Sequence, residues 1–271
     1  MGASVSDTLI IIPTYISKRE HAVVLDKCVK SIRETTNTEI LLVDDCSPSE
    51  DQRELLFSFF ENNYENISAI VKEENEGFSA TVNHGLKKAI FEERDALLLN
   101  ADIEFTNNVW LDNLEDTDAD IVGALLLYPN DIIQHAGIYF SSFSRNFDHR
   151  FKGAPSNCPQ AHIPCECPVT GALQFIRKEC LNDVGLYDEN FRLGYEDVDF
   201  MIRAITGGYK SLYNPKVTAY HHESLMRGND PSDQHVQWQK ESYMTLVKKY
   251  GGVEFYSVAP SYMEQYELPK S

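Results

Sequence analysis

Four short apolar runs, separated by longer segments of helical character, constrain the fold of this chain more than any other feature. The runs cover residues 9–12, 39–43, 67–71 and 96–99. The segments between them, residues 21–33, 49–64 and 79–91, are predicted as helices. Strands joined by helices of this length imply right-handed crossovers and a mostly parallel sheet. The predicted fold class is therefore α/β.

The second half of the chain is less regular. Residues 121–128 and 133–142 are predicted as strands around a turn, and residues 169–177 and 217–221 as further strands. Helices are expected over residues 195–206 and 232–250. The segment 145–168 is rich in Pro, Cys and polar residues and is predicted as a long loop, which in a compact domain is usually functional or disordered.

The charge of the chain argues against a nucleic-acid partner. Lys and Arg number 24 against 42 Asp and Glu, and the formal net charge is -18. A duplex binder needs a basic stripe that displaces counterions, and the sequence has none. No apolar stretch approaches the ~20 residues that a transmembrane helix requires. We expect a cytoplasmic protein without a transmembrane segment, with peripheral attachment to a membrane as the alternative.

Three of the six cysteines gather in one segment with a histidine. Cys158, His162, Cys165 and Cys167 could form a zinc site, but their spacing contains no regular pair of Cys separated by two residues. With no signal-peptide pattern, reduced thiols are the default expectation.

Polar, acidic and aromatic residues follow each of the four apolar runs. In parallel sheets, ligands bind outside the carboxyl ends of the strands, so these residues are expected to share one site. The sequence has no Gly-x-Gly-x-x-Gly turn and no Walker loop, so neither a dinucleotide cofactor nor a P-loop is predicted. The segments concerned are 13–15, 44–47, 74–78 and 100–102.

Two further groups of residues have the chemistry of a catalytic site. Glu196, Asp197 and Asp199 lie at a predicted helix start, where carboxylates serve either as helix caps or as a general base. Successive helical residues point about 100° apart, so only one of Glu196 and Asp197 is expected to face a substrate. Asp102 and His221 are either structural residues or ligands of a metal ion.

These motifs, in this order and spacing, resemble the inverting glycosyltransferases of family 2, which have the GT-A fold, and most closely their rhamnosyltransferase-like branch. The resemblance covers about residues 8–224, or four fifths of the chain. It is carried by residues 12–15, 42–47, 75–85, 98–102, 134–137, 169–172, 184–191 and 196–199 and by His221.

The resemblance implies a GT-A domain over residues 1–230, with a mostly parallel central sheet and a mixed second half. Its nucleotide-binding half would cover about residues 1–103 and its acceptor and catalytic half about residues 104–230. Residues 231–271 would form a C-terminal helix and tail. The resemblance predicts no oligomeric state.

The resemblance also assigns roles to individual residues. Asp197 would be the catalytic base, and Glu196 would contact hydroxyls of the donor or acceptor. Asp102 and His221 would bind Mn²⁺ or Mg²⁺. The nucleotide of the donor would be held by residues of the four strand ends, with Tyr15 near the base and Asp44 accepting its imide N–H: Pro13, Thr14, Tyr15, Asp44, Asn75, Gly77, Phe78, Asn100 and Ala101.

One position departs from the pattern of the family. Asn100 replaces the first Asp of an Asp-x-Asp motif and removes a charge from the nucleotide side. The partners implied are a nucleotide-sugar donor, of UDP or dTDP type, and a saccharide or glycoconjugate acceptor. The alternatives are a non-catalytic nucleotide-sugar-binding module and a sugar nucleotidyltransferase. The latter would need a Gly-rich loop after the first strand, where residues 14–19 contain no glycine.

Overall fold

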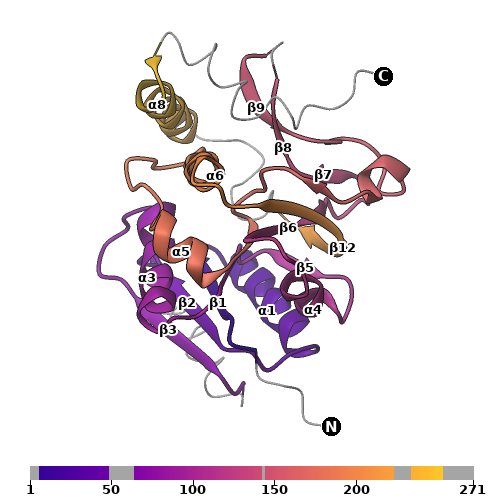
Figure 1. The fold of residues 1–271 in the computed structure, drawn as a ribbon. Helices are drawn as coiled ribbons and strands as arrows, with labels where there is room; N and C mark the ends of the chain where they lie inside the picture. The colour runs from indigo at the N-terminus through magenta and orange to yellow at the C-terminus, as the bar shows by residue number, and fades with distance from the viewer. Residues whose placement is uncertain (1–5, 49–63, 142–143, 223–232, 253–271) are drawn as a thin grey trace.

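The computed structural model of the chain describes residues 6–48, 64–141, 144–222 and 233–252 (Figure 1). Its centre is a mixed sheet with the strand order β10-β12-β6-β11-β4-β1-β2-β3. The N-terminal half of this sheet consists of β1 (Leu9–Thr14), β2 (Ile40–Asp44), β3 (Ile67–Val71) and β4 (Ala96–Leu99). These four strands are parallel, as predicted, so their carboxyl ends lie on one edge.

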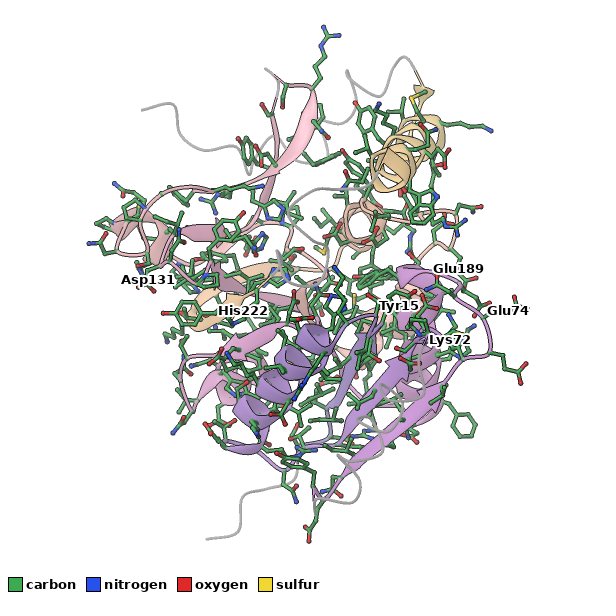
Figure 2. All side chains as sticks on the ribbon, turned by 180° about the vertical axis from the view of Figure 1, so that it is seen from behind. Tyr15, Lys72, Glu74, Asp131, Glu189 and His222 are labelled. Atoms are coloured by element: carbon green, nitrogen blue, oxygen red, sulfur yellow. The ribbon has the colours of Figure 1, made fainter. Side chains whose placement is uncertain are left out.

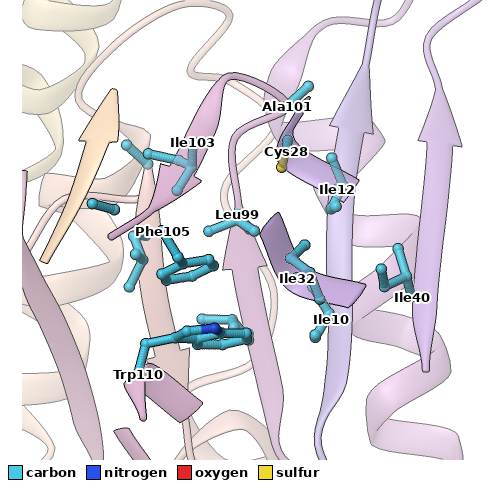
Figure 3. Close-up of a cluster of buried hydrophobic side chains, with 14 of the residues drawn as sticks. Ile10, Ile12, Cys28, Ile32, Ile40, Leu99, Ala101, Ile103, Phe105 and Trp110 are labelled. Atoms are coloured by element: carbon cyan, nitrogen blue, oxygen red, sulfur yellow. The ribbon is translucent and has the colours of Figure 1, made fainter. Parts of the chain in front are cut away.

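Helices cover both faces of the parallel strands. α1 (Arg19–Arg33) and the short α4 (Trp110–Glu115) lie on one face, where Ile10 and Ile12 of β1 pack in a fully buried cluster (Figure 3). Within this cluster the Phe105 and Trp110 rings stack at 3.8 Å between centroids. α3 (Phe78–Phe91) covers the opposite face.

A glycine sets the distance between α3 and the sheet. A Cβ at Gly85 would lie 2.3 Å from a methyl carbon of Ile11, so no larger residue fits there without displacing β1. The helix predicted over residues 49–64 lies largely outside the described residues.

The second half of the sheet is mixed. β11 (Leu173–Ile176) is antiparallel to both β4 and β6 (Ile121–Leu127), and β12 (Ser211–His221) is parallel to β6. The pairing of β12 with β6 shifts register between Asn214 and Thr218, on either side of Pro215, which has no N–H for the ladder. β5 (Ile103–Phe105) and β10 (Cys165–Glu166) pair antiparallel with β12.

The predictions for this half need several corrections. The strand expected over residues 133–142 is two strands, β7 (Ile133–His135) and β8 (Ile138–Ser141), because Gly137 between them has φ +104°. The expected long loop contains β9 (Asn146–His149), which pairs with β8, as well as a 3-10 helix (Pro159–His162) and β10. The strand expected over residues 169–177 is confined to β11. Two helices, α4 and α5 (Lys178–Val184), were not predicted because they are too short to show a helical period.

The two longest helices of the second half pack against each other. α6 (Glu196–Thr206) and α8 (Asp233–Lys249) begin and end within one residue of the predicted helices. Leu246 and Val247 of α8 are buried with Val198 and Ile202 of α6. α8 therefore belongs to the same packed unit as the start of α6. Among the described residues, no helix has both the length and the apolar character to cross a bilayer.

Candidate active site

Two adjoining cavities open at the carboxyl edge of the parallel strands, where Figure 2 shows Tyr15 and Lys72. The larger has a volume of about 550 Å³ and the smaller about 270 Å³. They share four wall residues: Phe78, Asn100, His221 and Gln239. The two cavities are therefore direct neighbours.

The larger cavity brings together almost all residues that were predicted to bind a nucleotide and a metal. Tyr15 is 41% exposed and offers its ring to the cavity. The predicted residues that line it are Pro13, Thr14, Tyr15, Asn75, Gly77, Phe78, Asn100, Ala101, Asp102 and His221.

Asp44 is the exception among the predicted nucleotide-binding residues. Its side chain is fully buried and lines neither cavity. The Ser47 backbone N–H (2.9 Å) and the hydroxyl groups of Ser47 and Thr14 donate to its carboxylate. In this structure Asp44 holds the turn after β2, and its contact with a nucleobase stays a prediction.

The neighbouring Asp45 lines the larger cavity instead, and it was not predicted as a site residue. Lys72 forms a buried ion pair with it at 2.7 Å. The backbone N–H groups of Glu76 (2.9 Å) and Gly77 (3.0 Å) donate to the same carboxylate. Gly77 has φ +89°, a conformation that strongly favours glycine. Asp45 thus fixes the loop that carries Asn75, Gly77 and Phe78 onto the cavity wall.

β5 brings Asp102 and His221 together although they are far apart in the sequence. Ile103, next to Asp102, pairs with His221 across β5 and β12, and the His222 N–H donates to the Asp102 carbonyl oxygen at 3.0 Å. His221 Nε2 lies 3.2 Å from Asp102 Oδ1. Both side chains are buried, with 3% exposure for Asp102 and 6% for His221.

The buried amide of Gln134 sets the orientation of the His221 ring. His221 Nδ1–H donates to Gln134 Oε1 at 2.6 Å, and the Asn100 amide lies 3.3 Å from Nε2. With Nδ1–H donated to Gln134, Nε2 is the ring nitrogen that faces the Asp102 carboxylate. Such an outer hydrogen bond is the usual way in which proteins orient a metal-binding histidine.

The pair fits two neighbouring positions around a divalent cation. Two ligand atoms at about 2.1 Å from one ion in adjacent octahedral positions lie about 3 Å apart. The Asp102–His221 distance of 3.2 Å is close to this value. Within the described part of the chain, no cluster of three or more His, Cys, Asp or Glu side chains is arranged to hold a metal ion. Any metal at this pair needs further ligands from a bound molecule or water.

The start of α6 forms one wall of the smaller cavity. Both Glu196 and Asp197 line it, and which of them faces a substrate stays a prediction. They are the first two residues of the helix, after Tyr195 with φ +67°. Asp199 is instead fully buried, where Arg203 (3.0 Å) binds its carboxylate, and its role is structural.

Asp197 is held by three hydrogen bonds. The Thr170 hydroxyl (3.1 Å) and the Gly171 N–H (3.0 Å) donate to Oδ2, and the Val198 N–H (2.8 Å) donates to Oδ1. A Cβ at Gly171 would lie 3.3 Å from the Asp197 Cβ, tighter than most contacts of this kind. The absence of a side chain at Gly171 therefore lets the segment after β10 approach the helix end.

A buried tyrosine lies beneath these acidic residues. The Tyr187 hydroxyl donates to Gln174 Oε1 at 2.8 Å. Burial raises the pKa of Tyr187 well above its usual value, and the charges of Asp197 and Glu196 raise it further. Tyr187 therefore stays a neutral phenol at neutral pH.

α8 contributes wall residues that were not predicted from the sequence. Trp238 lines the larger cavity and Gln239 lines both, and the Arg192 guanidinium lies 4.5 Å from the centre of the Trp238 ring. No recognised motif includes α8. Gln134, by contrast, lies in the recognised segment 134–137 but had no role assigned to it.

Comparison with known proteins identifies relatives, among them two with functional names. The chain is 28% identical over 247 residues to the uncharacterized protein y4gI of Sinorhizobium fredii. This alignment covers 86% of this chain and 26% of y4gI. It is 28% identical over 151 residues to the O-antigen biosynthesis protein RfbC of Myxococcus xanthus, covering 52% of this chain and 12% of RfbC. It is also 30% identical over 92 residues to an N-acetylglucosaminyl-diphospho-decaprenol L-rhamnosyltransferase of Mycobacterium tuberculosis, covering 33% of this chain and 30% of that enzyme. The chain thus spans less than a third of each of these relatives.

Solved structures confirm the predicted GT-A fold. GalNAc-T7, solved with UDP, GalNAc and Mn²⁺, matches with a TM-score of 0.65 and 18% identity over 95% of this chain and 54% of that chain. The mannosyltransferase PcManGT from Pyrobaculum calidifontis, solved with GDP-Man and Mn²⁺, matches with a TM-score of 0.58 and 16% identity over 92% of this chain and 64% of that chain.

The family model described as Glycosyl transferase family 2 matches residues 9–161, which include the loop held by Asp45 and the metal-ligand candidate Asp102. Since this match covers more than half of the sequence, the chain belongs to glycosyl transferase family 2.

Proposed function

We propose that the chain is an inverting glycosyltransferase that uses a divalent cation, Mn²⁺ or Mg²⁺. It moves a sugar from a nucleoside-diphosphate sugar, with UDP or dTDP favoured, to a hydroxyl of a glycan or glycoconjugate. One observation carries the proposal: Asp197 lines one cavity, Asp102 lines the next, and His221 borders both. A base in one cavity and a cation site in the neighbouring cavity suit the transfer of a sugar from a donor to an acceptor.

The larger cavity suits the donor. Tyr15 on its wall has an aromatic ring suited to a nucleobase, and Asp102 lines it together with His221, which also lines the smaller cavity. A diphosphate carries two negative charges and would meet the Asp102 carboxylate. A bound divalent cation would neutralise the leaving diphosphate. The UDP and Mn²⁺ in the GalNAc-T7 structure and the GDP-Man and Mn²⁺ in the PcManGT structure support a nucleotide donor with a metal.

The smaller cavity suits the acceptor. Asp197 would take the proton of the acceptor hydroxyl as that oxygen attacks the anomeric carbon of the donor sugar. The bond from this carbon to the diphosphate oxygen breaks on the opposite side, so the configuration inverts. Thr170 and Gly171 hold the Asp197 carboxylate in place for this step. Glu196, on the same wall, would accept hydrogen bonds from sugar hydroxyls.

A thermal-shift screen of nucleoside diphosphates and their sugars, with and without Mn²⁺, tests the donor assignment. A ligand at 100 times its Kd stabilises the folded chain by about 2.7 kcal/mol. We expect the melting temperature to rise with a uridine or thymidine diphosphate when Mn²⁺ is present and to change little without it. Equal shifts with and without Mn²⁺ would exclude the metal role, and a shift only with guanosine diphosphates would exclude the favoured bases.

Hydrolysis of the best donor separates an enzyme from a binding module. We expect slow release of free sugar from the donor without acceptor, dependent on Mn²⁺. An NMR spectrum of the first transfer product then reports the anomeric configuration, and a retained configuration would exclude direct displacement at Asp197.

A further inference from the structure

A pair of cysteines, Cys165 and Cys167, lines neither cavity and has no role in the proposed transfer. Cys165 lies in β10, which pairs antiparallel with β12, and Cys167 follows two residues later. Residues two apart in an extended strand point to the same side. The two sulfur atoms accordingly lie 3.2 Å apart. Cys167 is fully buried and Cys165 is half-buried.

These cysteines do not form the zinc site considered from the sequence. His162, the expected fourth ligand, lies 2.7 Å by its Nε2 from the Ser156 carbonyl oxygen. The Cys158 thiol lies 3.3 Å from Gln160 Oε1. Neither side chain reaches the Cys165–Cys167 pair.

A guanidinium group is the cationic partner of the two sulfur atoms. Arg150 Nη1 contacts Cys165 Sγ and lies 3.8 Å from Cys167 Sγ. In the part of the chain that the structure describes, Arg150 forms no ion pair with a carboxylate, and its Nε is buried without a hydrogen-bond partner. A positive charge with sulfur as its polar partner favours a thiolate at that sulfur.

The two thiols differ in acidity. The hydrogen bond with Cys167, together with Arg150, lowers the pKa of Cys165 to about 7 against the opposing effect of its partial burial. The same interaction with Cys165, together with burial, raises the pKa of Cys167 well above its usual value. Burial also raises the pKa of the two deepest remaining cysteines, Cys28 and Cys180. Cys165 is thus a candidate nucleophile with a protonated thiol beside it.

We propose that Cys165 and Cys167 form a peroxide-reactive dithiol, in which Cys165 is the attacking and Cys167 the resolving residue. The Cys165 thiolate attacks one oxygen of a hydroperoxide, the O–O bond breaks, and the leaving oxygen takes up a proton to give water or an alcohol. The Cys167 sulfur then attacks the sulfenic acid sulfur, an S–S bond forms, and water leaves. The two thiols are oxidised by two electrons and the hydroperoxide is reduced by two.

The geometry suits the second step. A disulfide has a sulfur–sulfur distance of about 2.05 Å, so the two atoms must approach by roughly 1 Å. The Cys167 backbone is anchored to β12, because its N–H donates to the Ser211 carbonyl oxygen (3.1 Å) and its own carbonyl oxygen accepts from the Ser211 hydroxyl (2.8 Å). Since Cys165 is also paired with β12, opposite Tyr213, the approach is expected from rotation of the cysteine side chains.

Oxidation would reach the smaller cavity through Arg150. Its backbone N–H donates to the Gly137 carbonyl oxygen at 2.8 Å, and the residues next to these two, His149 and Ile138, line the cavity. A disulfide removes the sulfur partner of the guanidinium. On the proposed function, we expect slower transfer to acceptor with unchanged donor binding. The dithiol chemistry itself does not depend on that function.

Treatment of the reduced full chain with hydrogen peroxide tests the proposal, with alkylation of the remaining thiols and peptide mapping by mass spectrometry. We expect one disulfide, between Cys165 and Cys167. Cys165 should react roughly threefold faster at pH 7 than a free cysteine peptide, since its larger thiolate fraction outweighs its lower nucleophilicity. A different pairing, or reaction of Cys165 no faster than the peptide, would overturn the proposal.

Two variants and a matched control test the roles of the residues. With Cys167→Ser, dimedone should label a sulfenic acid at Cys165, and with Arg150→Gln the oxidation should slow several-fold. Cys158→Ser, in the same segment, should leave the rate unchanged. The absence of label at Cys165 in the Cys167→Ser chain would exclude Cys165 as the attacking residue, even if a disulfide forms in the wild type.

Discussion

Substitution of Asp197 by asparagine removes the proposed base with little change in shape. Oδ2 of Asp197 accepts hydrogen bonds from Thr170 and Gly171, and the amide oxygen of asparagine can take that position. In the wild type the Val198 N–H donates to Oδ1 at 2.8 Å. In the variant it faces the amide NH₂ of asparagine, which cannot accept this hydrogen bond. The loss of this one hydrogen bond costs about 1 kcal/mol of stability, so the variant should fold.

The effect on transfer should be much larger than the effect on folding. A positioned base contributes about 10²–10⁴-fold to a rate, which corresponds to about 2.7–5.5 kcal/mol of activation free energy. Release of nucleoside diphosphate in the presence of acceptor measures transfer, and titration calorimetry with Mn²⁺ measures donor binding. We expect the rate of Asp197→Asn to fall by this factor and the donor Kd to change less than about twofold.

A surface aspartate provides the control for the change of charge. The Asp118 side chain is 93% exposed and lies opposite Lys210, so Asp118→Asn loses the same charge away from both cavities. Its rate and donor Kd should equal those of the wild type. Our reasoning about Asp197 is refuted if Asp197→Asn keeps more than a tenth of the wild-type rate, or if it loses donor binding together with transfer.

Three further predictions concern the support of the site and the stability of the fold. Gln134→Met frees the His221 ring and should weaken Mn²⁺-dependent donor binding by about 10–100-fold in calorimetry, whereas an unchanged affinity would mean that Gln134 does not orient His221. Asp45→Asn removes one of the two carboxylates that pair with buried Lys72, leaves the half-exposed Glu76 at 2.9 Å, and should reduce the free energy of unfolding in urea by about 1–3 kcal/mol; no measurable loss would contradict this role. Burial lowers the pKa of His135 well below its usual value of about 6.5, so the unfolded chain binds a proton that the folded chain does not, and this contribution to stability is lost as the pH falls below 6.5. Between pH 6.5 and 5.5, His135→Phe should therefore lose about 1 kcal/mol less unfolding free energy than the wild type, and an equal pH dependence of the two would exclude His135 as the titrating group.

The parallel half of the fold could be predicted because its signals are local. The run from Leu9 to Ile12 is apolar at every position, and all four side chains are fully buried. Such runs, with helices between them, leave few alternatives to a parallel sheet. The strand ends then place Tyr15 and Asp102 on one edge without any knowledge of tertiary contacts.

The mixed half could not be predicted to the same degree because its elements depend on partners far along the chain. β5 has three residues and exists through its pairing with β12, which brings Asp102 to His221. β9 has the polar sequence Asn-Phe-Asp-His and is a strand because β8 pairs with it. Neither segment has an alternation of apolar and polar residues long enough to predict a strand.

The roles of two neighbouring aspartates show a similar limit. The sequence places Asp44 and Asp45 together at a strand end, and the family resemblance favoured Asp44. In the structure the alternation of β2 turns Asp44 inward to Ser47, and Asp45 meets Lys72 at the cavity. Which of two adjacent acids faces a site depends on the exact turn, which residue spacing alone does not define.

The position of a manganese ion tests the central claim most directly, because the whole account depends on a cation site next to the proposed base. Crystals grown with Mn²⁺ and UDP would be measured at a wavelength where manganese scatters anomalously. We predict one strong peak within about 2.2 Å of both an Asp102 carboxylate oxygen and His221 Nε2, with the diphosphate bound to the same ion and the uracil beside Tyr15. A manganese peak elsewhere, or UDP bound with no metal between Asp102 and His221, would contradict the account.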